Sequence, residues 1–254
     1  MKKVLVTTLA ATAALAGLQA WAASEKRETG DFTEVGYHLP YEVTFVTADE
    51  PYVLMEGDED SIEKITIEEK GDRLLLKRED PSWFNWSDDE KDVIITIGYV
   101  ALDAIKMSGS GDGYAEAIDA GDFAISIAGS AELEIENLKA DEVSISIAGS
   151  GDAKVNNLEA DEVASSIAGS GDIELGGEAN AQSIKIAGSG DYDAAELRSQ
   201  EADASISGSG DIVVWSVATL DASIMGSGDI GYYGNPDVSQ RVMGSGEISS
   251  RGSK

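Results

Sequence analysis

The chain has 254 residues, of which 42% are hydrophobic, and its 48 Asp and Glu against 18 Lys and Arg give a formal net charge of −30. This acidity argues against nucleic acid and anionic membrane surfaces as partners, because both are bound through Lys and Arg. With no Cys and a single His, the sequence excludes a disulfide framework, a cysteine nucleophile and metal sites built on thiolates or several histidines.

Residues 1–22 have the features of a secretory signal peptide. Lys2 and Lys3 give a positive start, an apolar or small run of 15 residues follows, and Ala20-Trp21-Ala22 forms an A-x-A cleavage pattern. The apolar run is shorter than the roughly 20 residues that span a bilayer, which favours a cleaved leader over a membrane anchor. The sequence therefore predicts an exported protein without a membrane span after cleavage, placed in the periplasm or on the cell surface of a Gram-negative bacterium.

Residues 23–105 contain no clear repeat, but their apolar clusters are typical of short β-strands. Acidic, turn-like stretches such as 56–60 separate clusters at 41–45, 65–67, 74–76 and 93–97.

Two features of this region are candidates for function. His38 is the only general-base candidate of its type, but no nearby Ser or acid pattern supports a catalytic role, so we expect a surface or packed His. Trp83, Phe84 and Trp86 form an aromatic cluster in an acidic, loop-like stretch. They would form either a platform on which a sugar or peptide stacks or a plug over the end of the core, and the plug is the preferred interpretation.

A repeat of 18–20 residues dominates the remainder, residues 106–250. The motif Gly-Ser-Gly-Asp, or a near copy of it, begins at Gly109, Gly129, Gly149, Gly169, Gly188, Gly208, Gly226 and Gly244. The flanks alternate, as in Ser144-Ile145-Ser146-Ile147, which is the period of a strand with one buried face. Since paired glycines interrupt helices, the repeat predicts an all-β, parallel β-helix (β-solenoid) in which each repeat forms one coil.

Alignment of the repeats on the first Gly produces two further columns. The residue two places before it is always apolar, which predicts a continuous interior column. The residue three places after it is always acidic, which predicts an outward acidic ladder of Asp112, Glu132, Asp152, Asp172, Asp191, Asp211, Asp229 and Glu247.

The acidic ladder has two interpretations. Calcium-binding β-rolls also contain Gly-Asp repeats, but their period is about half as long. The preferred alternative is that each acid accepts hydrogen bonds from backbone N–H groups of the corner. We therefore predict no cofactor and no specific metal site, and at most weak, non-specific binding of divalent cations along the ladder.

The ends of a solenoid need covering, because terminal coils otherwise expose core and unpaired strands. We interpret residues 23–105 as irregular first coils and a cap that are continuous with the repeats, so that residues 23–254 form one domain. Tyr232 and Tyr233, in the penultimate coil, are candidates for a cap at the other end or for a second aromatic platform.

The segments 30–35, 41–45, 71–74, 108–112, 233–236 and 244–246, taken together, resemble the GIN-type domain family, which is described as the head domain of auto-transporter adhesins. The similarity runs from about residue 28 to 250. It implies a right-handed parallel β-helix in an exported protein of the bacterial envelope, and it implies no reaction and no catalytic residues.

These features favour a non-enzymatic, adhesin-like module that binds or scaffolds at the cell envelope, with a cell-surface glycan or an envelope protein as partner. Two alternatives stay open. One is a glycan-active enzyme, a polysaccharide lyase or hydrolase, because such enzymes also use β-helices. The other is a structural solenoid that associates with itself end to end.

Overall fold

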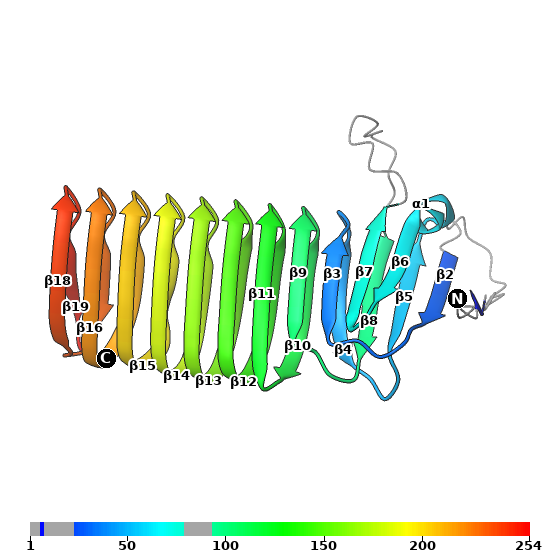
Figure 1. Cartoon of the computed structure of the whole chain (residues 1–254), viewed down its shortest axis with the longest axis horizontal. Coiled ribbons are helices and arrows are strands. Elements are labelled where there is room, and N and C mark those ends of the chain that lie inside the picture. Colours follow the sequence, from blue (N-terminus) through cyan, green and yellow to red (C-terminus); the bar gives the residue numbers. More distant parts are fainter. Residues whose placement is uncertain (1–5, 8–22, 79–92) are drawn as a thin grey trace, which may run out of the picture.

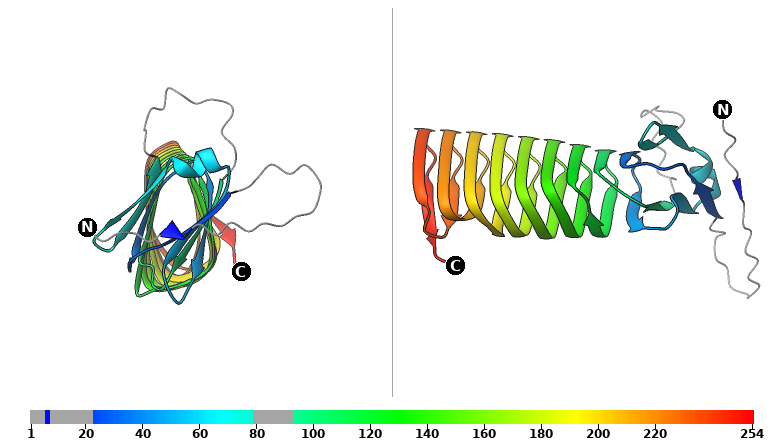
Figure 2. Two further views of the ribbon diagram at one scale, coloured as in Figure 1. Left: turned by 90° about the vertical axis from the view of Figure 1, so that its right-hand side faces the viewer. Right: turned by 60° about the horizontal axis from the view of Figure 1, so that its bottom comes forward.

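The computed structural model describes residues 6–7, 23–78 and 93–254, and these form one elongated stack of β-coils (Figure 1). Viewed end-on, the coils superpose as a flattened ring, so the molecule is long in one direction and narrow in the other two (Figure 2). The predicted parallel β-solenoid is confirmed, with about 7 turns.

The regular coils begin with strands that cover half a turn each, β9 (Ala104–Gly109), β10 (Asp112–Asp119) and β11 (Asp122–Gly129). They continue as single long strands that bend around a whole coil: β12 (Glu132–Gly149), β13 (Asp152–Gly169), β14 (Ile173–Gly188), β15 (Tyr192–Gly208) and β16 (Ile212–Gly226). The coil after β16 is again divided, into β17 (Ile230–Tyr233) and β18 (Asp237–Gly244), and β19 (Ile248–Gly252) begins a further coil by pairing in parallel with β17. Neighbouring coils pair in parallel, with each motif stacked on the next.

The corners are glycine because successive coils approach too closely there for a side chain. At Gly226 φ is +148°, and an added Cβ would lie 1.9 Å from the carbonyl oxygen of Gly208. The second glycine of the motif is equally constrained, since a Cβ at Gly228 would lie 1.9 Å from the oxygen of Gly210. The corner therefore requires Gly for its conformation at the first position and for the close approach at both.

The predicted interior column is buried from the first coil to the penultimate one. Its members are at most 2% exposed and comprise Met107, Ile127, Ile147, Ile167, Ile186, Ile206 and Ile224. The expectation was wrong for Val242, which is 42% exposed. Val242 lies in β18, and no described strand pairs with the outer edge of β18, so this end of the column stays open to solvent.

A polar chain crosses the largely apolar interior between β14 and β16. The Tyr192 phenol donates to Gln182 (3.1 Å), the Gln182 amide donates to Ser199 (2.7 Å), and the Ser199 hydroxyl donates to the carbonyl oxygen of Trp215 (3.1 Å). Burial raises the pKa of Tyr192, so it stays a neutral donor. Because each polar group has a partner, the chain fixes the relative position of three coils.

The N-terminal part contains both parallel and antiparallel strands. Its elements are β1 (Val6–Thr7), β2 (Ala23–Glu28), β3 (Glu34–His38), β4 (Glu42–Thr47), β5 (Tyr52–Gly57), α1 (Glu59–Glu63), β6 (Ile65–Lys70), β7 (Arg73–Arg78) and β8 (Val93–Tyr99). β3 and β4 extend the two faces of the solenoid in parallel, whereas β2–β5, β5–β8 and β6–β7 are antiparallel pairs. The short helix α1 was not predicted. It begins where the Asp58 carboxylate accepts the backbone N–H of Ser61 (3.2 Å).

Replacing Ile147 by Asp is expected to unfold the coil around it, because an unpaired carboxylate in the aliphatic column costs at least about 3 kcal/mol, a large part of a typical domain's stability. Thermal melting followed by circular dichroism measures the loss. Ser146→Asp is the matched control, since Ser146 is the exposed neighbour on the same strand. An unchanged melting temperature in Ile147→Asp would contradict the inward position of this column.

Candidate functional site

A shallow groove runs along the outer face of the sheet from β11 to β18. It consists of two hollows of about 410 and 670 Å³ that share Glu162 and Ala164. Strand residues alternate between the two faces, so the outward side chains line the groove while inward neighbours such as Val143 and Val163 belong to the core beneath it. The groove is thus built by the same repeat that builds the core.

The carboxylates of the groove stand one above another in successive coils. The position that begins with Asp122 is acidic in five of seven coils and continues through Glu142, Glu162, Ala181, Glu201, Thr219 and Asp237. We call this set the groove column. Within the described part of the chain, no side chain or backbone group donates a hydrogen bond to its five acids.

A second outward position lies two residues further along each strand. It is Ala or Ser in five coils and Asp in two: Ala124, Ser144, Ala164, Ser183, Asp203, Asp221 and Ser239. Small side chains leave room above the sheet next to the acids. The groove therefore has closely spaced carboxylates next to a row of mostly small side chains.

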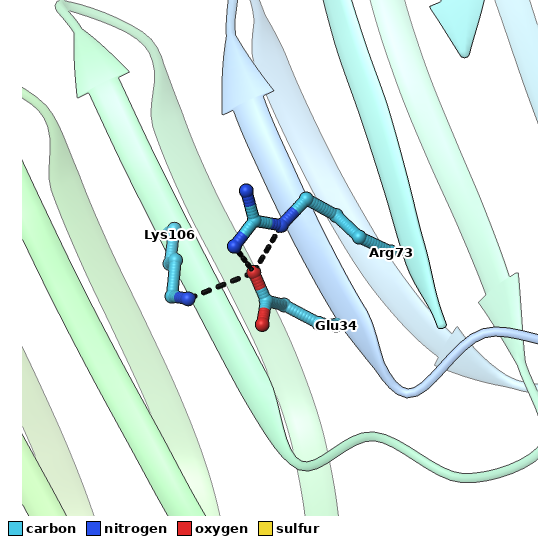
Figure 3. Close-up of polar contacts among 3 residues, drawn as sticks. All are labelled: Glu34, Arg73 and Lys106. Carbon is cyan, nitrogen blue, oxygen red and sulfur yellow. Dashed lines mark hydrogen bonds and ion pairs between the residues drawn. The ribbon is translucent and has the colours of Figure 1, made fainter. Parts of the chain in front are cut away.

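A cluster of three charged side chains lies on the same sheet toward the N-terminal end (Figure 3). The Glu34 carboxylate accepts hydrogen bonds from Lys106 Nζ (2.8 Å) and from the guanidinium of Arg73. Burial alone would raise the pKa of Glu34, but the hydrogen bonds and charges of Lys106 and Arg73 hold it below its usual value. Lys106 and Arg73 therefore form ion pairs with Glu34, on the N-terminal side of the groove column.

His38 lies at the end of β3, exposed on this face. Partial burial and the positive charges of Arg73 and Lys77 lower its pKa. A catalytic imidazole is usually oriented by a carboxylate, and the charges that act on His38 are cationic instead.

The predicted acidic ladder lies at the corners, where the long strands begin, as Glu132 does in β12 and Asp152 in β13. From Asp152 to Asp229, each carboxylate accepts a hydrogen bond of 2.7–2.9 Å from the backbone N–H of the ladder residue in the next coil. The chain passes through Asp172, Asp191 and Asp211 and ends at the N–H of Glu247. The chain begins only at Asp152, because the N–H of Asp152 itself donates to the carbonyl oxygen of Ala131 (3.0 Å). The five corner acids from Asp152 to Asp229 thus have a structural hydrogen bond that the acids of the groove column lack in the described residues.

Of the five aromatic candidates, two lie within the described residues. Trp83, Phe84 and Trp86 lie outside the described residues. Tyr232 and Tyr233 are half-buried on β17, next to Val214 and Trp215 of the preceding coil. Their assignment as a cap or a platform stays a prediction.

Sequence reasoning missed the groove column and Trp215. The groove column has a clear signal, because it lies seven residues before the first Gly of each motif. Trp215 has one aromatic counterpart at the same offset from its motif, Tyr233, and a single pair does not form a column that marks it in the sequence.

No convergent metal site is present in residues 6–7, 23–78 and 93–254, where no three His, Cys, Asp or Glu side chains are placed to hold one ion. Within the same residues, no helix is long and apolar enough to cross a membrane.

The family model described as "Putative auto-transporter adhesin, head GIN domain" matches residues 31–236. Among solved structures, one described as a putative lipid binding protein from Parabacteroides distasonis is 28% identical, with a TM-score of 0.84 over 90% of this chain and 96% of that chain. A putative adhesin from Parabacteroides merdae has the same TM-score at 22% identity and covers 90% of this chain and 95% of its own. The second likeness shows the fold alone. No curated protein matches the chain in sequence.

The stacked acids predict that salt stabilises the protein. Neighbouring coils are about 4.8 Å apart, and two unit charges at that distance repel by about 0.9 kcal/mol in water. Raising ionic strength from 0.1 to 1 M shortens the screening length from about 10 to about 3 Å. We therefore expect the melting temperature to rise with NaCl, and to rise at lower concentrations of MgCl₂ or CaCl₂, which bridge neighbouring carboxylates.

The matched variant Glu142→Gln/Glu162→Gln separates the groove column from the net charge. Its melting temperature should be higher than that of the wild type at low salt and should rise less when salt is added. The control variant Asp49→Asn/Glu50→Gln, outside both columns, should show the same rise in melting temperature with salt as the wild type. Saturable stabilisation by calcium that magnesium does not reproduce would indicate a specific calcium site. A flat response to all three salts would show that the stacked acids do not repel.

Proposed function

Since the chain belongs to the GIN-domain family of auto-transporter adhesin heads, we propose that it is an exported, non-enzymatic binding module of the bacterial cell envelope whose ligand lies in the acidic groove. The observation that carries this proposal is the groove column, whose acids Asp122, Glu142, Glu162, Glu201 and Asp237 have no hydrogen-bond donor in the described part of the protein. Exposed, unpaired carboxylates in a fixed array are ready to pair with cations.

The repetition of the groove suits an elongated ligand. Seven coils at about 4.8 Å span roughly 29 Å from Asp122 to Asp237. Catalytic sites instead bring together different groups, an acid, a base and a stabilising donor, around one reacting atom. A column of equivalent carboxylates provides repeated, equivalent contacts, which favours binding over catalysis.

Charge decides the chemistry of the partner. A groove lined by carboxylates attracts cationic groups and repels anionic ones, so we propose an extended, Lys- and Arg-rich segment of another envelope protein. At about 3.3 Å per residue, roughly nine residues of extended chain would cover the groove. The small side chains at Ala124, Ser144 and Ala164 leave room for its backbone.

The test is a titration of a fluorescent ten-residue peptide of alternating Lys and Thr, followed by fluorescence anisotropy. The groove variant Glu142→Gln/Glu162→Gln/Glu201→Gln/Asp237→Asn should bind at least tenfold more weakly than the wild type, because four pairing partners are lost. The expected affinity falls with added NaCl.

The control variant Glu116→Gln/Glu159→Gln/Glu174→Gln/Glu178→Gln removes the same charge from exposed positions outside the groove. It should bind within about twofold of the wild type. Equal weakening in both variants would mean that the peptide responds only to net charge, and the groove would not be a site. Binding of a neutral glycan on an array, or release of reducing sugar, would contradict the proposed partner and favour the glycan-directed alternative.

A further inference from the structure

A second constellation, away from the groove, holds an ammonium group. Lys254 Nζ lies 2.5 Å from a carboxylate oxygen of Glu196 and 2.9 Å from the carbonyl oxygen of Ala195. It also lies 4.8 Å from the ring centre of Tyr233 and 5.5 Å from that of Trp215. A carboxylate, a carbonyl and two aromatic faces are the groups that bind an alkylammonium ion.

The site exists because the coils become shorter at this point. The motif spacing falls from 20 residues before Gly208 to 18 after it. In the pairing of β15 with β16, Ala194 matches Val214 and Arg198 already matches Trp215, so residues 195–197 have no counterpart. This bulge places Ala195 and Glu196 beside the aromatic rings of the two following coils.

The surroundings hold the site in place. The Asp193 carboxylate accepts the backbone N–H of Ala195 (2.9 Å), which stabilises the bulge. On the other side, the buried Ser199 hydroxyl donates to the carbonyl oxygen of Trp215 (3.1 Å). Trp215 and Tyr233 are neighbours in the sheet and both are half-buried. The backbone at Ala195 and Trp215 is thus held by contacts that do not involve Lys254.

We propose that this constellation is a binding site for a lysine side chain of another polypeptide, and that Lys254 occupies it in the unbound protein. The occupant shown by the structure is itself a lysine, so the length and charge of that side chain fit. The site is accessible, because Glu196 is exposed and Lys254 is held by these contacts alone in the described structure. The proposal does not depend on the acidic groove, which uses other residues on another part of the coil.

Lys254 competes with an incoming lysine because its tether gives it a high local concentration. Removing it should therefore raise the apparent affinity for a free lysine side chain, since the binding-competent, empty state becomes fully populated. Removing the carboxylate should have the opposite effect.

The experiment is a titration with Nα-acetyl-L-lysine N-methylamide, followed by NMR through the indole N–H signal of Trp215, which is assigned by its absence in Trp215→Phe. In Lys254→Met, which keeps the aliphatic side chain, the signal should shift saturably, with an apparent affinity about fivefold higher than in the wild type. In Lys254→Met/Glu196→Gln the affinity should fall about tenfold below that of Lys254→Met.

The analogue that is also acetylated on Nε has the same shape without the charge and should cause no saturable shift. No saturable shift with the charged probe in Lys254→Met would overturn the proposal, and Lys254 would then be a structural latch only. Equal binding of charged and acetylated probes would overturn it as well, because the site would recognise the aliphatic chain and not the ammonium.

Discussion

Backbone contact between successive glycine corners is the interaction on which the rest of the solenoid depends. The N–H of each motif Ser donates to the carbonyl oxygen of the first Gly in the preceding coil, at 2.8–2.9 Å from Ser130 to Ser245. This approach is open only to a corner without side chains, since a Cβ at Gly226 would lie 1.9 Å from the oxygen of Gly208. Once the corners are in register, every residue at a given offset from the corner stacks on its counterpart. One backbone contact thus determines the interior column, the corner ladder and the groove column together.

The same stacking brings like charges together, and the two acidic columns differ in how the protein responds. At the corner, Asp172 accepts an N–H of the next coil, so a fixed dipole offsets part of the repulsion from Asp152 and Asp191. The groove column has no such donor in the described residues, and its repulsion is relieved only by solvent ions or by a ligand. A protein that keeps unpaired acids in register uses part of its stability for that arrangement, which is characteristic of binding surfaces.

The repeat made the solenoid predictable from sequence, because Gly pairs, the apolar column and the acidic column all recur at one spacing. The groove column was also predictable in principle, since Asp122 and Glu142 lie at the same offset from their motifs. The antiparallel pairs of β2, β5 and β6 follow no repeat, and nothing local distinguishes their partners. Helix α1 has only five residues, and its capping Asp58 lies in a stretch whose acidity is equally typical of a turn. The constellation around Lys254 depends on contacts with Ala195 and Glu196, 59 and 58 positions earlier in the sequence. No repeat in the sequence predicts contacts at these separations.

Regular and irregular coils contribute different kinds of chemistry. Where the period is constant, neighbouring coils place identical groups side by side, so the surface repeats one interaction and its strength grows with length. A site that needs unlike groups, such as a carboxylate, a carbonyl and two aromatic rings around one cation, requires a break in the period. The step from 20 to 18 residues supplies that break at Ala195 and Glu196, while the buried chain from Tyr192 to Trp215 keeps the neighbouring coils aligned across it. The constellation around Lys254 therefore depends on the change in coil length, whereas the groove column continues through that change, because its residues keep a constant offset of seven from the first Gly of each motif.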